Sequence, residues 1–172
     1  MNVFTKSLSI AAFGVVAFSS IQAAQAQTTT TGNIVLPTTG TKEIGLAGSY
    51  HFNTPKFYSA QILLGYFTSP SLELGGQLTV AGADGTSAAT NVNAFADYYL
   101  ANGSNSPLLP YVGLTAGYEH YSGHDSTSIG GEVGAKYFLN SNVAVNAKFQ
   151  YVGARNITGQ SDFILGLSTF IK

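Results

Sequence analysis

Cysteine is absent from this chain of 172 residues, which excludes a disulfide framework, a thiolate metal site and a lipid-modified N-terminal cysteine. Charged residues are also scarce, at 9% of the chain, whereas an ordinary soluble domain has about 25%. The net charge is −1, so the charge balance does not favour nucleic acid as a partner. After Ala26 no run of about 18 apolar residues occurs, so no membrane-spanning helix is expected there.

The first 26 residues have the organisation of a secretory signal peptide. Lys6 precedes an apolar run over residues 8–18, and small residues stand at Ala24 and Ala26. An apolar core of about eleven residues is too short for a membrane anchor, because spanning needs about 20. We therefore expect cleavage after Ala26.

The remaining chain divides into a lead-in and one domain. Residues 27–41 are rich in threonine and glycine with little to bury, which predicts a flexible segment. Residues 42–172 contain eight segments in which apolar and polar residues alternate with a period of two, each about as long as a tilted membrane-spanning strand. The segments are residues 42–52, 57–68, 71–81, 90–100, 109–121, 127–139, 142–154 and 161–171.

One face of each segment is apolar, and the other carries the glycines, small polar residues and charges. Because eight strands enclose an interior just wide enough for side chains to fill, the small polar face fits inside and the apolar face points outward. Lipid explains outward apolar residues and also requires every strand edge to be paired. The sequence predicts an all-β fold: a closed eight-stranded antiparallel up-and-down transmembrane β-barrel with a polar, side-chain-filled interior. A soluble lipocalin-like barrel, apolar inside, is the alternative.

The charges in the middle of the strands all fall on the inward face. They form a predicted lumen charge network of Glu43, Glu73, Asp97, Glu119, Glu132, Lys136 and Lys148. Such residues either fill a small barrel with paired charges or form a catalytic or ion-conducting group, and burial without partners is costly. The network has more acids than lysines. The excess negative charge must be balanced by His51, by water, or by protons that some of the acids retain because their pKa is raised.

The pairing of Glu132 with Lys148 depends on the turn between their strands. If residues 139–141 form the connection, antiparallel pairing sets Glu132 directly opposite Lys148. A connection two residues longer sets Glu132 opposite Gln150, with Lys148 as a diagonal neighbour.

An even number of strands puts both termini on one side of the membrane, and secretion makes that side periplasmic. Outward aromatic residues then fall at two levels, as the aromatic girdles of membrane barrels do. The expected girdles are Tyr50, Tyr58, Tyr118, Tyr151 and Phe163 near the outer interface, and Tyr66, Tyr98 and Tyr137 near the inner one.

Two runs, residues 110–118 and 131–143, resemble the OmpA-like eight-stranded outer membrane β-barrel family of Gram-negative bacteria. The resemblance implies the fold and an outer membrane location, with both termini periplasmic. It also implies outer membrane lipids, lipopolysaccharide and the barrel assembly machinery as partners. Two departures stand out. Phe170 is followed by Ile171 and Lys172 where the family usually ends on an aromatic residue. We also expect no peptidoglycan-binding domain after the barrel, so a cell-wall tether is not implied.

Catalytic and cofactor motifs are weak or missing. His124 and Ser126 have the spacing seen in small-barrel lipid A deacylases, but both have lumen-side parity, whereas a lipid-cleaving pair must face the bilayer. Residues 82–86 contain a single acid, too few for a calcium site. No phosphate loop, metal cluster or basic patch occurs. We expect no cofactor, no metal and a structural or surface-interaction role, with a host or surface ligand as a candidate partner. A lipid-modifying enzyme and a narrow channel are the alternatives.

Overall fold

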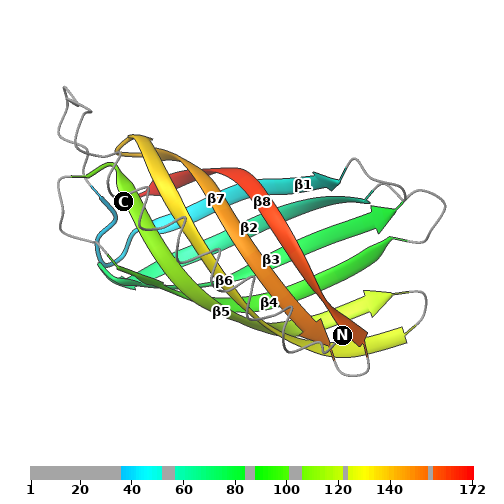
Figure 1. The fold of residues 1–172 in the computed structure, drawn as a ribbon. Coiled ribbons are helices and arrows are strands. Elements are labelled where there is room, and N and C mark those ends of the chain that lie inside the picture. The colour runs from blue at the N-terminus through cyan, green and yellow to red at the C-terminus, as the bar shows by residue number, and fades with distance from the viewer. Residues whose placement is uncertain (1–35, 52–56, 84–87, 101–105, 122–123, 155–156) are drawn as a thin grey trace. The chain divides into compact units, whose positions relative to one another are not determined.

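The computed structural model describes residues 36–51, 57–83, 88–100, 106–121, 124–154 and 157–172. In this part, eight antiparallel strands form a closed barrel in which each strand pairs with its neighbours in sequence and β1 pairs with β8 (Figure 1). The strands are β1 (Lys42–His51), β2 (Phe57–Ser69), β3 (Leu72–Ala83), β4 (Ala89–Tyr99), β5 (Leu108–Tyr121), β6 (His124–Asn140), β7 (Val143–Ala154) and β8 (Ile157–Ile171). The predicted fold class is confirmed. No helix in the described ranges is long and apolar enough to cross a membrane.

Two strands begin earlier than the alternation predicts. β6 begins at His124 and β8 at Ile157, because their first residues, which do not follow the apolar alternation, continue the hydrogen-bonded ladders with β5 and β7. Residues 124–126 and 157–160, which lie between the predicted segments, are therefore strand. The expected signal peptide, residues 27–35 of the lead-in and residue 52 of the first predicted segment lie outside the described residues.

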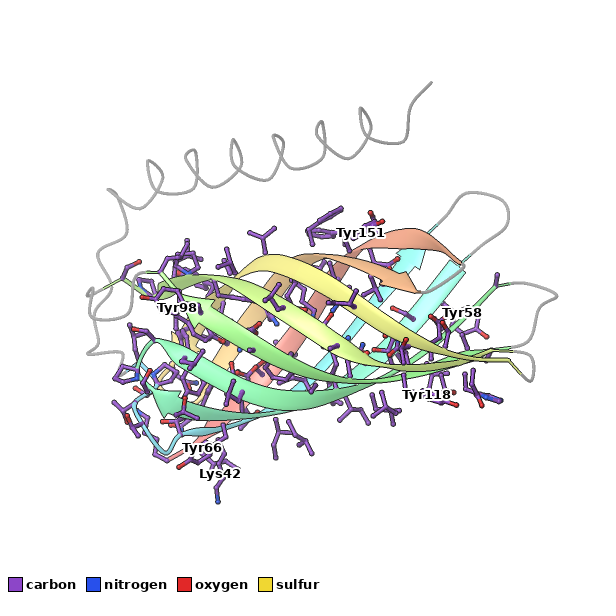
Figure 2. All side chains as sticks on the ribbon, turned by 90° about the horizontal axis from the view of Figure 1, so that it is seen from below. Lys42, Tyr58, Tyr66, Tyr98, Tyr118 and Tyr151 are labelled. Atoms are coloured by element: carbon purple, nitrogen blue, oxygen red, sulfur yellow. The ribbon has the colours of Figure 1, made fainter. Side chains whose placement is uncertain are left out.

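Alternation places the two kinds of side chain on opposite faces of the barrel wall. Large apolar residues point outward along every strand, as with Leu114 and Ile129, which are 70% and 72% exposed. Inward positions are buried, including Gln61, Gln77 and Asn93. Figure 2 shows the side chains over the length of the strands. A continuous exposed apolar wall matches the lipid-facing surface that the sequence predicts.

The end of the barrel where β1 begins and β8 ends is here named the terminal end, and a turn there leads into β1. Gly40 has a φ of 91° in the turn from Thr38 to Thr41, a conformation that glycine adopts without steric cost. The Gly40 amide donates a hydrogen bond to the Phe67 carbonyl at 2.8 Å, and the Phe67 amide donates to the Thr41 carbonyl at 2.9 Å. The last residues of the predicted lead-in are thus fixed to β2.

The ladder between β1 and β8, here named the seam, closes the barrel. It runs from Lys42 opposite Ile171 to Gly48 opposite Leu165 and has seven paired positions. The ladder between β5 and β6 has fourteen, so the seam has far fewer pairs.

The register of β6 against β7 differs from the direct pairing expected. Glu132 is opposite Gln150, and Lys148 is opposite Gly134. The direct pairing of Glu132 with Lys148 is therefore wrong, and the alternative register is found. The turn lies at residues 141–142, later than assumed, and a β-bulge makes Leu139 an extra residue in β6.

Two adjacent glycines on β3 provide a test of which face is inside. A Cβ added to Gly75 would overlap the Leu64 carbonyl oxygen and the Phe95 ring, whereas one added to Gly76 would meet nothing nearer than the Asn93 carbonyl oxygen at 3.8 Å. We expect Gly75→Ala to lower the free energy of unfolding by about 1–3 kcal/mol through overpacking. Gly76→Ala should change it by less than about 0.5 kcal/mol. Urea unfolding in detergent micelles, followed by circular dichroism, measures both; equal effects would contradict the assigned faces.

Candidate functional site in the barrel interior

An aromatic cluster fills the barrel interior at the terminal end. Its members are apolar side chains at inward positions near strand ends, each at most 1% exposed: Phe67, Tyr99, Leu109, Tyr111, Phe138, Ala144 and Phe170. Phe67 stacks on Tyr99 with ring centroids 5.2 Å apart, and the rings of Phe138 and Phe170 are 4.9 Å apart. Leu36 packs against the cluster from the segment before β1. The terminal end is therefore closed by packed apolar side chains.

Lys136 lies against this cluster and joins three strands. Its ammonium group on β6 forms ion pairs with Glu43 on β1 and, at 3.0 Å, with Glu73 on β3. The Tyr99 hydroxyl donates a hydrogen bond to the same Glu73 oxygen at 2.5 Å. All three charged side chains are at most 1% exposed, so they are almost completely removed from solvent.

Aromatic rings complete the surroundings of the Lys136 ammonium group. Its nitrogen lies 5.2 Å from the centroid of Tyr99, 5.5 Å from Tyr111, 5.7 Å from Phe170 and 6.0 Å from Phe67. A cation within about 6 Å of a ring face is attracted by the ring, and the attraction grows when water is excluded. Carboxylates and rings together thus compensate for the burial of this charge.

Lys148 forms a second group on β7. Its ammonium nitrogen lies 3.1 Å from Glu132 Oε2 and 3.2 Å from Gln77 Oε1. Gln150, which is directly opposite Glu132, donates a hydrogen bond to the same Glu132 oxygen at 2.8 Å. The shifted register therefore makes Lys148 a diagonal partner of Glu132 and leaves the pair in contact, because a long side chain reaches a diagonal neighbour.

The remaining acids are less fully paired. Asp97 is 1% exposed, lies directly opposite Glu73, and its Oδ1 has no hydrogen-bond partner among the described residues. The same holds for one carboxylate oxygen each of Glu43, Glu73 and Glu132. Four acids and two lysines are buried in the described interior. Glu119 is half-buried nearer the other end of the barrel, opposite Asn91 and Ser126.

The coupling between Glu132 and Lys148 can be measured with a double-mutant cycle. We expect Glu132→Gln and Lys148→Met each to destabilise the barrel, because each leaves a buried charge without its partner. The double variant should lose less than the sum of the single losses, with a coupling energy of about 0.5–3 kcal/mol. The measurement is urea unfolding in detergent.

The control cycle combines Glu132→Gln with Lys42→Met, a lysine on the outer wall. Additive losses are expected there, since these two side chains share no partner. Additive losses in the Glu132 and Lys148 cycle itself would show that the contact contributes nothing.

Ser126, one of the two residues with the deacylase-like spacing, does not face the membrane. Ser126 occupies an inward position opposite Glu119, and residue 124 has the same parity at the beginning of β6. The His124 side chain lies outside the described residues. In the ranges that the structure describes, no group of three or more His, Asp or Glu side chains is placed to hold a metal ion.

The aromatic residues expected in the girdles lie on the outer wall. Their exposed fractions run from 41% to 57% for Tyr58, Tyr66, Tyr98, Tyr118, Tyr137, Tyr151 and Phe163. The labelled tyrosines separate along the barrel, with Tyr66 and Tyr98 towards the terminal end and Tyr58 and Tyr118 towards the other end (Figure 2). The Tyr50 side chain lies outside the described residues.

Sequence reasoning missed the aromatic cluster. It assigned the interior to small polar residues and treated aromatic residues chiefly as outward. The signal was nevertheless present, because Phe67, Tyr99 and Phe170 all have inward parity close to strand ends on one side of the barrel.

An apolar outer wall around a charged and aromatic interior is the organisation of a membrane-spanning barrel. Residues 11–169 match the family model described as outer membrane protein beta-barrel domain, and the chain belongs to this family of outer membrane β-barrels. No curated protein sequence matches the chain.

Several solved barrels have the same fold. The N-terminal barrel of Pseudomonas aeruginosa OprF is 18% identical, with a TM-score of 0.62, and the match covers 78% of this chain and 100% of that one. P. aeruginosa OprG is 13% identical, with a TM-score of 0.56 and coverage of 79% and 98%. Neisserial surface protein A is 20% identical, with a TM-score of 0.54 and coverage of 77% and 94%. At these identities the likeness concerns the fold alone.

Proposed function

We propose that this outer membrane barrel is a non-catalytic protein that stabilises the envelope or interacts at the cell surface, and that it is not an open channel. The observation that carries the proposal is the filled interior. Lys136, which lies against the aromatic cluster, connects β6 to β1 and β3. Lys148 connects β7 to β6 and β3. Side chains that span the lumen and pack at one end suit a rigid barrel better than a water-filled pore.

Recordings from planar lipid bilayers test this proposal. The refolded protein should give no steady conductance in the nanosiemens range, while a porin inserted in the same membranes gives one. Insertion is checked separately by the difference in gel mobility between heated and unheated samples. Stable large openings from inserted protein would overturn the proposal in favour of a channel.

The proposal places the terminal end in the periplasm. The turns there at residues 70–71 and 141–142 have two residues each, and periplasmic turns of such barrels are short. Since the chain has no cysteine, single thiols can be introduced at Ser71 on this end and at Ala88 on the other. A membrane-impermeant thiol reagent should label Ala88→Cys in intact cells and Ser71→Cys only after permeabilisation; the opposite result would reverse the orientation.

The interior also argues against a lipid-modifying enzyme. A bilayer lipid would have to reach Ser126 from the lumen, because its position faces inward. The outer wall instead suits outer membrane lipids and lipopolysaccharide as partners, and the barrel assembly machinery would insert the strands. The apolar wall and the two levels of outward tyrosines support these partners.

A further inference from the structure

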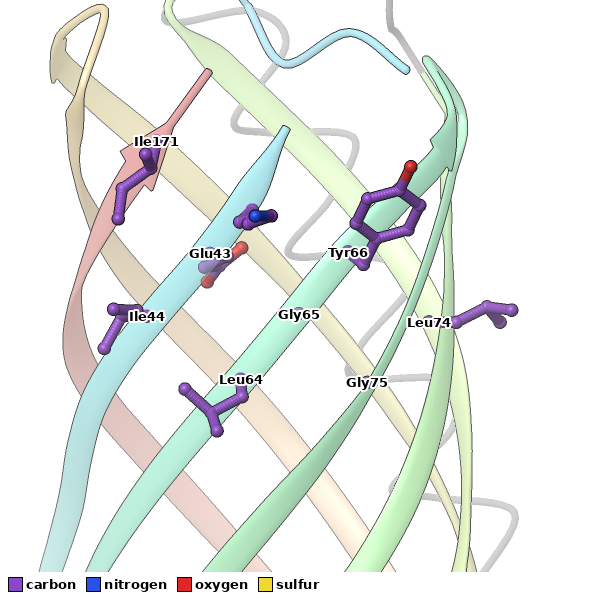
Figure 3. A pocket seen from close by; sticks show the side chains of 9 residues that line it. Glu43, Ile44, Leu64, Gly65, Tyr66, Leu74, Gly75 and Ile171 are labelled. Carbon is purple, nitrogen blue, oxygen red and sulfur yellow. The ribbon is translucent and has the colours of Figure 1, made fainter. Parts of the chain in front are cut away.

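A groove on the outer wall at the terminal end has a volume of about 440 Å³. It crosses β8, β1, β2 and β3, and its sides are the outward residues Ile44, Leu64, Tyr66, Leu74 and Ile171 (Figure 3). Gly65 and Gly75, which are directly paired inward positions, line it with their backbones. Glu43 also lines it, but its carboxylate is buried in an ion pair with Lys136. The surface that the groove offers to a ligand is almost entirely hydrocarbon.

Lys42 supplies a positive charge at one end of the groove. It is directly opposite Ile171 on β8 and Tyr66 on β2, and it projects from the terminal end close to Tyr66 (Figure 2). Among the outward positions of the described strands, Lys42 is the only lysine or arginine. It forms no ion pair with another described residue, in contrast to the buried Lys136 and Lys148.

The combination of an apolar groove and one free cation matches a lipid. A groove in the outer wall opens to the bilayer, where acyl chains are the abundant ligand, and a lysine near the membrane surface attracts anionic head groups. We propose that the groove binds an acyl chain of an anionic phospholipid whose phosphate is held by Lys42. This site rests on the proposed orientation, which puts the terminal end in the periplasmic leaflet.

The positive charge of Lys42 should distinguish between anionic and zwitterionic lipid head groups. The phosphate of phosphatidylethanolamine is neutralised by the lipid's own ammonium group, whereas that of phosphatidylglycerol is not. Lys42 should therefore favour phosphatidylglycerol, while the apolar groove contributes equally to lipids with the same acyl chains. Tyr66 lies beside Lys42, at a level where tyrosines favour the membrane interface.

Native mass spectrometry of the folded protein in detergent tests the site, with phosphatidylglycerol and phosphatidylethanolamine of identical acyl chains as probes. Phosphatidylglycerol should bind more tightly to the unaltered protein. Lys42→Gln should weaken that binding about fivefold, as expected for one lysine near the surface, and leave phosphatidylethanolamine unchanged. Ile44→Trp, which fills the groove, should weaken the binding of both lipids. Leu114→Trp, an equally outward substitution on β5, is the matched control and should alter neither.

Equal binding of the two lipids, or an unchanged affinity in Lys42→Gln, would overturn the proposal. So would a dimer that disappears in Ile44→Trp without any loss of bound lipid, since a second copy of the chain would then occupy the groove. Gel mobility confirms that each variant is folded. Failure of lipid selectivity in a folded, non-conducting barrel would refute this site and leave the proposed function standing, whereas large conductance would refute the function alone.

Discussion

Replacing Lys136 with methionine is expected to lower the free energy of unfolding by about 3–5 kcal/mol, the range measured when one partner of a buried ion pair is removed. The variant leaves Glu43 and Glu73 buried without their cation and also removes a charge surrounded by four aromatic rings. Because the chain has no tryptophan, unfolding in urea and detergent is best followed by circular dichroism.

Two further variants separate charge from packing. Lys42→Met makes the same substitution on the outer wall and should change stability by less than about 0.5 kcal/mol. Combining Lys136→Met with Glu43→Gln and Glu73→Gln removes all three charges and should recover part of the loss, since a neutral interior needs no cation. If Lys136→Met is as stable as the unaltered protein, the ion pairs do not contribute to the barrel.

Phe67→Ala is expected to cost about 3–5 kcal/mol, because it loses the transfer free energy of the ring and leaves a cavity between Tyr99 and Phe170. Phe67 is fully buried, and its backbone also anchors the turn before β1. The control is Phe163→Ala, which removes a ring that is 57% exposed on the outer wall. Detergent fills the space left there, so only the transfer contribution is lost. Equal losses in the two unfolding experiments would contradict a tightly packed cluster.

The alternation of residues was sufficient to predict the closed barrel and which face of each strand lies inside. The period of two identifies the inward face of every strand, because a shift by one residue would exchange the inward and outward faces entirely. The same rule placed Glu43, Glu73, Asp97 and Glu132 on the inward face, where the structure has them buried.

Pairing between charges could not be derived with the same certainty. The register of β6 against β7 depends on the bulge at Leu139, and residues 138–140 do not by themselves indicate an extra residue there. Contacts across the lumen are harder still, because Lys136 meets Glu43 and Glu73 from strands that are not its neighbours in the sheet. These contacts across the lumen depend on the barrel radius and on the conformations of long side chains. Neither can be predicted from the pattern of a single strand.

The short seam has a consequence for the lifetime of the folded state. Each of its pairs joins the two ends of the barrel sequence, and such distant pairings are entropically costly and slow to form. Glu43 and Phe170 are opposite each other across the seam, and both contact Lys136. Interactions of Lys136 with these two residues are thus expected to form after the transition state for folding. Interactions that form so late slow unfolding more than they accelerate folding. Lys136 is then expected to lower the unfolding rate of the closed barrel and to have little effect on its folding rate.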